Sequence, residues 1–163
     1  MKAIAPWRPG GHHDWLVAAL MLGADGVLVG TRFYASQEAA GAATAKNRML
    51  TATGDRTIRS ILFDIVRRNV WPSPYSGRVL QNAFSEKWRG READLLQHQD
   101  EEGARYAAAR AAGDFDTAAV IAGEVVDLIT DIPPAAEIVE RMVTTATRLL
   151  AGASNKYRIS QSE

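Results

Sequence analysis

Cysteine is absent from the 163 residues of this chain. Its absence excludes disulfide bridges, thiolate nucleophiles and cysteine-ligated metal sites. Neither sign of charge is in excess, because 19 Lys and Arg residues balance 19 Asp and Glu residues. Proteins that bind nucleic acids or anionic membranes usually carry a basic surplus. We therefore expect neither a nucleic acid nor a membrane as a partner.

Long hydrophobic runs are also missing. No apolar segment approaches the roughly 18 residues needed to cross a bilayer, and no basic and then apolar signal segment opens the chain. Hydrophobic residues make up 47% of the sequence and charged residues 23%, which is ordinary for a globular protein. The composition therefore predicts a cytoplasmic protein with a buried core.

The most informative stretch is GADGVLVGTRF, residues 23–33. Its apolar centre predicts a short buried strand over residues 26–30, held between two glycine-containing turns. Gly30 and Thr31 follow at the end of this strand, and Arg32 adds charge from the same turn. Glycine lets backbone N–H groups approach phosphate oxygens without a Cβ in the way, so we predict a phosphate site here. An ordinary helix–turn–strand unit is the simpler alternative.

Most of the remaining chain is predicted to be helical. Residues 57–66 suit either a strand or a helix, and residues 69–78, with two prolines and a glycine, suit a loop. Capping residues and apolar spacing predict helices over 15–22 with Asp14 as N-cap and Gly23 as its end, over 37–50 with Ser36 as N-cap, over 79–112, over 117–129 with Asp114 or Asp116 as N-cap, and from Pro134 onward.

Histidine at position 12 is a candidate base. It follows Gly10 and Gly11, and an imidazole titrates near neutral pH and can accept a proton in its neutral form. A solvated histidine near the N-terminus is the simpler interpretation. We expect no metal site, because His12, His13 and Asp14 are adjacent and point apart, and the distant His98 does not complete a ligand set.

Three other side chains have both a functional and a structural interpretation. Glu124 borders the apolar stripe of its segment, where a carboxyl group can have a raised pKa and a functional role. The alternative is that Glu124 extends to solvent. Trp71 and Tyr75 lie in the predicted loop, and we expect them to pack the loop onto the body rather than to contact a ligand.

Several motifs together resemble one family. Residues 23–33 resemble the phosphate-binding strand and turn of the nitronate monooxygenases, a family of FMN enzymes. The resemblance continues in the same order through WPSPYSGRVLQNAF (71–84), WRGRE (88–92) and residues 111–142. It covers most of the chain, from about residue 18 to about residue 150.

The resemblance implies an α/β fold: a C-terminal fragment of an FMN-binding TIM-type (β/α)₈ barrel plus a mainly α-helical tail. A complete barrel of this type takes about 250 residues. On this basis residues 1–66 form a partial barrel segment with the phosphate-binding strand and turn, residues 67–153 a helical C-terminal region, and residues 154–163 a flexible tail.

The resemblance also implies a site and an activity. Gly10, Gly11, Gly30 and Thr31 are the implied cofactor-binding positions, and the cofactor is FMN. We assign no catalytic residue, because the family's Gly-Gly-His histidine lies on an earlier strand, whereas His12 lies just before the helix that leads to Gly23. The implied reaction is the oxidative denitrification of nitronates or nitroalkanes with oxygen. For a partial chain we expect little activity, together with self-association.

Two alternatives stay open at this stage. One is a helical interaction module without chemistry of its own, and the other is a related FMN barrel such as a flavin-dependent enoyl reductase. Purified protein with flavin absorbance favours an FMN enzyme, whereas colourless protein that captures a partner favours the module.

Overall fold

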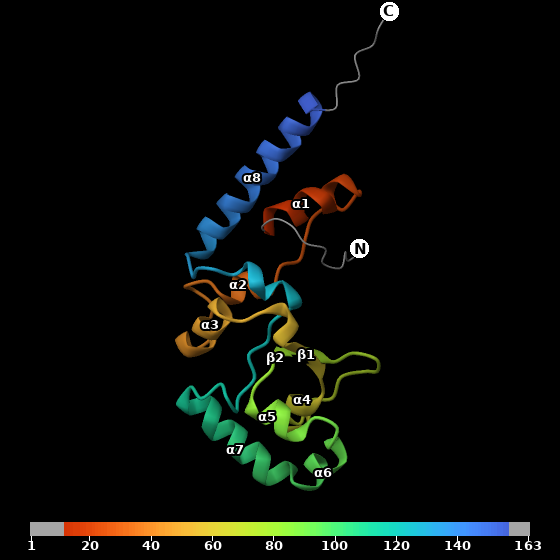
Figure 1. The fold of residues 1–163 in the computed structure, drawn as a ribbon, viewed down its shortest axis with the longest axis vertical. Coiled ribbons are helices and arrows are strands. Elements are labelled where there is room, and N and C mark those ends of the chain that lie inside the picture. The colour runs from red at the N-terminus through yellow and green to blue at the C-terminus, as the bar shows by residue number, and fades with distance from the viewer. Residues whose placement is uncertain (1–11, 157–163) are drawn as a thin grey trace, which may run out of the picture. The chain divides into compact units, whose positions relative to one another are not determined.

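The computed structural model describes residues 12–156, which fall into two compact units (Figure 1). Unit 1 combines the chain up to Ala39 with the chain from Ile132 onward, and unit 2 is the continuous stretch Ala40–Asp131. The boundaries taken from the family resemblance were 66/67 and 153/154, whereas the contacts divide the chain at 39/40 and 131/132.

Unit 1 contains the helices α1 (His12–Met21), α2 (Thr31–Tyr34) and α8 (Ala135–Lys156). Both α1 and α2 pack against α8. The buried stripe of α8 includes Ile138, Met142 and Ala146, at the spacing of one helical face. Pro134 stands immediately before α8, where its missing N–H costs nothing. The predicted C-terminal helix is therefore confirmed.

The first helix is confirmed with an earlier start. Because α1 begins at His12, Asp14 lies inside the helix and the prediction that Asp14 is its N-cap is wrong. The end is as predicted: Gly23 has φ +85°, and its N–H donates to the Leu20 carbonyl at 3.0 Å. Residues with a Cβ rarely adopt this left-handed conformation, which explains the glycine.

The predicted strand over residues 26–30 is wrong. The segment has no regular secondary structure, and Leu28 is 87% exposed. A strand forms only where a neighbour satisfies its backbone N–H and C=O groups. Within residues 12–156 the strands β1 and β2 pair with each other, so this apolar segment has no strand beside it.

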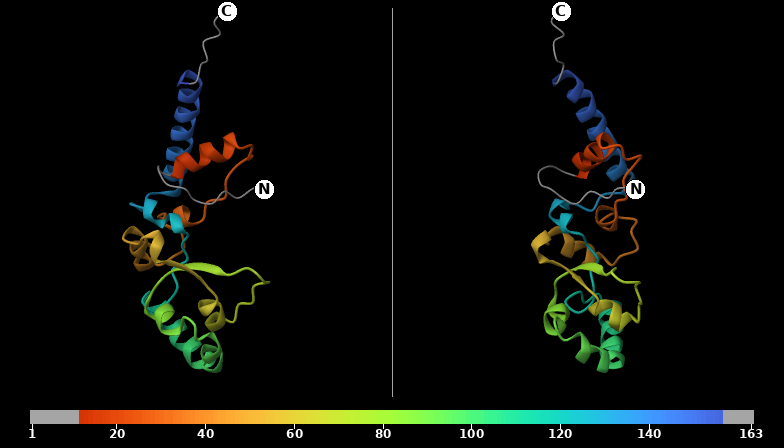
Figure 2. Two further views of the ribbon diagram at one scale, coloured as in Figure 1. Left: turned by 45° about the vertical axis from the view of Figure 1, so that its right-hand side comes forward. Right: turned by 90° about the vertical axis from the view of Figure 1, so that its right-hand side faces the viewer.

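Unit 2 is built on a two-stranded antiparallel sheet, β1 (Thr57–Ser60) and β2 (Gly77–Leu80). Thr57 lies opposite Leu80, and Ser60 lies opposite Gly77. The strand interpretation of residues 57–66 thus holds for its first part, since α4 (Leu62–Arg67) follows at once. The strand β2 lies where the sequence predicted a loop up to residue 78 and a helix from residue 79, so both predictions are wrong for residues 77–80. Figure 2 shows the connection from α4 extending away from the sheet before β2 begins.

A segment far along the chain adds to β2. The Leu80 N–H donates to the Val120 carbonyl at 2.9 Å, and the Ala122 N–H donates to the Arg78 carbonyl at 3.2 Å. These bonds hold residues 120–122 against β2, so the helix predicted over residues 117–129 is wrong. A short turn opens that range, residue Ile121 bridges to Val79 of β2, and the short 3₁₀ helix η2 (Glu124–Leu128) follows.

The other elements of unit 2 are helical. The helix predicted over 37–50 begins only at Ala43, and Ser36 is not its cap, because the Ser36 hydroxyl donates to the Phe33 carbonyl at 2.8 Å. The remaining elements are α3 (Ala43–Leu50), the 3₁₀ helix η1 (Gly54–Arg56), α5 (Ala83–Trp88), α6 (Glu92–Gln97) and α7 (Gln99–Ala112). Helix over 79–112 is therefore confirmed from Ala83, in three pieces.

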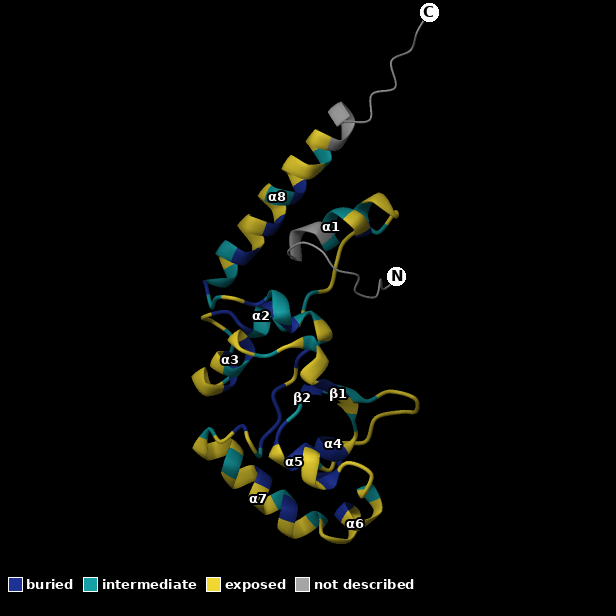
Figure 3. Ribbon diagram, in the orientation of Figure 1, coloured by how far each residue is buried: buried dark blue, intermediate teal, exposed yellow. Residues whose placement is uncertain are grey.

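An aromatic cluster forms the core of unit 2. The ring centroids of Phe63 and Phe84 lie 5.2 Å apart, and those of Phe63 and Tyr106 lie 6.2 Å apart. Figure 3 shows buried residues on α4 and along one side of α7 facing this core. Tilted ring pairs at such distances add to the free energy gained by burying the apolar surface.

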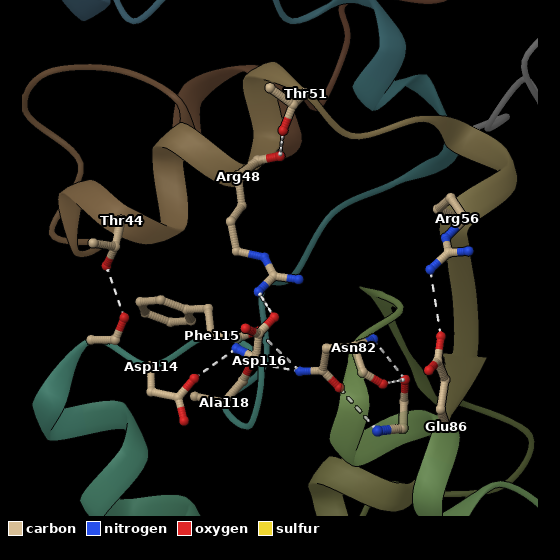
Figure 4. Close-up of polar contacts among 12 residues, drawn as sticks. Thr44, Arg48, Thr51, Arg56, Asn82, Glu86, Asp114, Phe115, Asp116 and Ala118 are labelled. Atoms are coloured by element: carbon tan, nitrogen blue, oxygen red, sulfur yellow. Dashed lines mark hydrogen bonds and ion pairs between the residues drawn. The ribbon is translucent and has the colours of Figure 1, made fainter.

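Asn82 is a buried polar residue that joins three segments. Its Oδ1 accepts the Ser85 N–H at 2.9 Å, and the Ser85 hydroxyl oxygen accepts the Asn82 N–H at 2.9 Å, so the pair forms a capping box at the start of α5. Its Nδ2 donates to the carbonyls of Phe115 at 3.2 Å and Ala118 at 2.9 Å (Figure 4). The side chain therefore fixes the turn after α7 relative to α5.

Glu102 is the buried carboxylate that links α7 to α5. The Lys87 ammonium and the Arg105 guanidinium each lie 2.9 Å from its Oε1. Burial on its own raises the pKa of Glu102, but the hydrogen bond and charge of Lys87, with the charge of Arg105, hold this pKa below its ordinary value of 4.5. The folded state therefore favours the ionised carboxylate.

We expect Glu102→Gln to lower the free energy of unfolding by about 1–3 kcal/mol near neutral pH, because it removes charged hydrogen bonds at a buried site. The pKa of Glu102 is lower in the folded state than in the unfolded state, so its ionisation stabilises the fold at pH values above the unfolded-state pKa. This stabilisation is lost as the pH falls through the folded-state pKa. Urea unfolding at neutral pH and below about pH 4 should show the difference from wild type shrinking in acid. The exposed neighbour Glu101→Gln is the control, and a deficit equal at both pH values would contradict the prediction.

Candidate functional site

Gly30 and Thr31, the predicted phosphate-binding pair, stand at the start of α2. The Gly30 carbonyl accepts the Tyr34 N–H at 2.9 Å, so Gly30 is the N-cap of this short helix. Its position is exposed, and a Cβ built on Gly30 meets no atom within 4 Å. Helix N-termini present N–H groups and a partial positive charge to anions. Gly30 is thus open to solvent at the start of α2.

Arg32 does not add charge to this turn as predicted. Its side chain is buried, and its Nη2 donates to the Ala35 carbonyl at 2.7 Å. The guanidinium therefore reaches the opposite end of α2 from Gly30. The two other glycines expected to bind the cofactor, Gly10 and Gly11, lie outside the described residues, as does the side chain of His12, whose backbone begins α1.

Glu124 begins η2 and pairs with Arg78 of β2. Arg78 Nη2 lies 2.7 Å from Glu124 Oε1, and Arg78 Nη1 donates to Thr57 Oγ1 at 3.1 Å. The Glu124 side chain is about half exposed and forms an ion pair with Arg78. It is therefore neither a solvated carboxylate without a partner nor a carboxylate buried among apolar groups. Sequence reasoning identified Glu124 and missed Arg78, whose partner is distant in the chain and which carries no local signal.

Gly54 completes this arrangement, which we term the Arg78 cluster: Gly54, Thr57, Arg78, Glu124 and Asp127. The Gly54 N–H donates to Asp127 Oδ1 at 2.5 Å, and the Thr57 hydroxyl donates to the Gly54 carbonyl at 2.7 Å. A Cβ built on Gly54 would lie 2.3 Å from the Glu124 carbonyl oxygen. The backbones of η1 and η2 therefore touch at a place where only glycine fits.

The aromatic loop between α4 and β2 is exposed throughout residues 68–75 (Figure 3). The Trp71 indole N–H donates to Asp64 Oδ1 at 3.2 Å, and the Arg67 guanidinium contacts the same buried carboxylate at 2.8 Å. Trp71 is thus tied to the body by this hydrogen bond, although the residue is 57% exposed. Tyr75 is 65% exposed, so the prediction that it packs onto the body is wrong.

Two absences hold for the described part of the chain. No three His, Asp or Glu side chains gather closely enough there to hold a metal ion. Among residues 12–156, no helix combines the length and the apolar character needed to cross a membrane.

Comparison with known proteins establishes the family. The family model of nitronate monooxygenase matches residues 10–145. A nitronate monooxygenase of Neurospora crassa is 31% identical over 131 residues, which cover 78% of this chain and 33% of the relative. The nitronate monooxygenase npaC of Metarhizium robertsii is 34% identical over 140 residues, covering 82% of this chain and 38% of the relative. The chain belongs to the nitronate monooxygenase family, and it spans only those fractions of these relatives' length.

Solved structures share the fold. FabK from Thermotoga maritima matches with a TM-score of 0.70 and 23% identity, over 88% of this chain and 44% of that one. A nitroalkane oxidase from Streptomyces ansochromogenes matches with a TM-score of 0.70 and 22% identity, over 87% and 38% of the two chains. The helix-rich α/β arrangement of this chain therefore also occurs as part of larger proteins. The family that the sequence motifs predicted is confirmed by the family model and the two relatives.

Proposed function

We propose that this chain serves as the C-terminal part of an FMN-dependent nitronate monooxygenase, an oxidoreductase that uses oxygen to denitrify nitronates or nitroalkanes. The observation that carries the proposal is the family match over residues 10–145. The exposed turn at Gly30 supports it, because that turn offers a phosphate room and a helix start in the segment where the family motif lies.

Gly30 and Thr31 would hold the FMN phosphate, with Gly10 and Gly11 as further proposed contacts. The missing side chain of Gly30 lets backbone N–H groups come close to phosphate oxygens, and the Thr31 hydroxyl adds a donor. When bound, FMN supplies the electron transfer between the substrate and oxygen, and the protein positions it. No residue among those described is assigned as the base.

We further propose that residues 27–29 become a barrel strand only where neighbouring strands flank them. Leu28 is 87% exposed and Val27 is 40% exposed, so in the isolated chain this segment offers apolar surface and unpaired backbone groups to other chains. The chain alone should therefore show little or no nitronate oxidation and should self-associate, because one strand cannot enclose a flavin ring.

Flavin absorbance after incubation with FMN, size-exclusion chromatography and oxygen consumption with a nitronate test the proposal together. We expect FMN to be retained, elution larger than a monomer and negligible turnover. A chain that never retains FMN would contradict the cofactor assignment, and colourless protein that captures a partner would favour the interaction module. Reduction of an enoyl substrate by the loaded chain would favour the enoyl reductase. Turnover matching a longer relative, from a monomer, would refute the partial-chain interpretation and restore His12 as candidate base.

Gly30→Val should abolish FMN retention without unfolding the chain. A side chain at this position meets no atom of the protein within 4 Å, so its branched carbons would fill the space proposed for the phosphate. Gly26→Val is the matched control, because a Cβ there also meets nothing within 4 Å. The measurement is bound flavin per chain after gel filtration, with circular dichroism to monitor folding. Equal retention by the Gly30 variant and wild type would remove Gly30 from the site.

A further inference from the structure

A shallow groove in unit 2 brings together two arginines and two serines. β1 supplies Arg59 and Ser60, Ser76 stands just before β2, and Arg89 follows the end of α5. These residues are distant from one another in the sequence, and the sheet and α5 together place them around one depression. No residue of the proposed FMN site lines this groove.

The arginines offer hydrogen-bond donors toward the groove. Within residues 12–156 the Arg89 guanidinium has no hydrogen-bond or ion-pair partner. Arg59 is held in place, because its Nη1 donates to the Ser76 carbonyl at 2.9 Å, and a guanidinium has further N–H groups to offer. Ser60 Oγ accepts the Leu62 N–H at 3.1 Å, so its own hydroxyl hydrogen is left to donate.

The charge of the groove selects the kind of anion. Glu92 also lines it, with Oε1 accepting the Gly90 N–H at 3.2 Å. Two guanidinium groups and one carboxylate leave a single positive charge, which a monoanion balances and a phosphate dianion exceeds. The planar fork of arginine matches the two oxygens of a carboxylate.

The apolar part of the groove selects what the anion carries. Ile58, which is buried, and Ile61, which is 48% exposed, both line it. Such a surface gains free energy when an alkyl chain covers it. We propose that this groove binds a short aliphatic carboxylate, with the carboxylate between Arg59 and Arg89 and the alkyl chain on Ile61.

Titration of the full chain with sodium hexanoate, followed by calorimetry and by the NMR signals of the arginine side chains, tests the proposal without any flavin. We expect saturable binding that Arg89→Met weakens by about tenfold, the effect of losing one charged hydrogen-bonding group. The control is Arg110→Met, because Arg110 lies exposed on α7, has no side-chain partner among the described residues and does not line the groove. Its affinity for hexanoate should equal that of wild type.

Hexanol and inorganic phosphate are the comparison ligands. Weaker binding of both supports the proposal, because hexanol lacks the charge and phosphate lacks the alkyl chain. The proposal is overturned by absence of saturable hexanoate binding, by hexanol binding as tightly, by phosphate binding as tightly, or by equal effects of the two methionine substitutions. Arg89 has no partner to lose, so unchanged thermal midpoints in both variants are expected and separate lost binding from lost folding.

Discussion

Gly54→Ala should destabilise unit 2 by about 3 kcal/mol, because overpacking against a fixed backbone forces the chain to move. The added Cβ would lie 2.3 Å from the Glu124 carbonyl oxygen, and relieving that overlap means separating η1 from η2. The same movement lengthens the bond from the Gly54 N–H to Asp127 Oδ1, now 2.5 Å. Urea unfolding of the variant and wild type, followed by circular dichroism, measures the loss.

Gly77→Ala is the matched control for this prediction. Its new Cβ would approach nothing closer than Asp64 Oδ2 at 4.0 Å, an ordinary contact. We expect a change within about 0.5 kcal/mol, as for a substitution without a named structural cost. If the two alanine variants unfold at the same urea concentration, η1 and η2 do not touch as described.

Asn82→Ala should cost about 2–4 kcal/mol, the sum of a lost helix cap and two buried carbonyls left without donors. The cap is the bond from the Ser85 N–H at 2.9 Å, and the two carbonyls belong to Phe115 and Ala118. The loss therefore loosens both the start of α5 and the turn after α7 (Figure 4). Urea unfolding of the variant and of wild type measures the total loss in the free energy of unfolding.

Asn82→Ser separates the two contributions. A serine hydroxyl can still accept the Ser85 N–H as a cap, but it does not reach the two carbonyls as the Asn82 amide does. Its cost should fall between those of wild type and Asn82→Ala. Equal stability of the serine and alanine variants would show that the cap contributes nothing, and equal stability of all three proteins would contradict the network.

The parts of the fold that sequence reasoning predicted are those set by local chemistry. Gly23 ends α1 because its φ of +85° suits glycine, and Pro134 with the spacing of Ile138, Met142 and Ala146 marks α8. These signals act over one or two turns of chain. The phosphate-binding role of Gly30 and Thr31 also comes from a short local motif, and it stays a prediction.

The parts that were missed depend on partners far away in the sequence. The strand β2 pairs with β1 and with residues 120–122. Because of these bonds, residues 117–129 do not form the helix that their sequence favours. Residues 27–29 have the composition of a strand, but among residues 12–156 no strand lies beside them. At the surface, Arg78 meets Glu124 and Arg59 lines a groove with Arg89 only after the sheet has formed, so no pattern along the sequence could show either arrangement.

The division into two units has a consequence for synthesis. Unit 2 is one uninterrupted stretch, whereas unit 1 needs both ends of the chain. The chain passes between the units at 39/40 and at 131/132. On the unit 1 side, hydrogen bonds join the segments next to these two boundaries: the Gln37 N–H donates to the Pro133 carbonyl at 3.0 Å, and the Ala135 N–H donates to Glu38 Oε2 at 2.8 Å. Because translation proceeds from the N-terminus, every residue of unit 2 leaves the ribosome before α8 does. The helix α1 therefore leaves the ribosome before all of unit 2 and before α8, the helix it packs against.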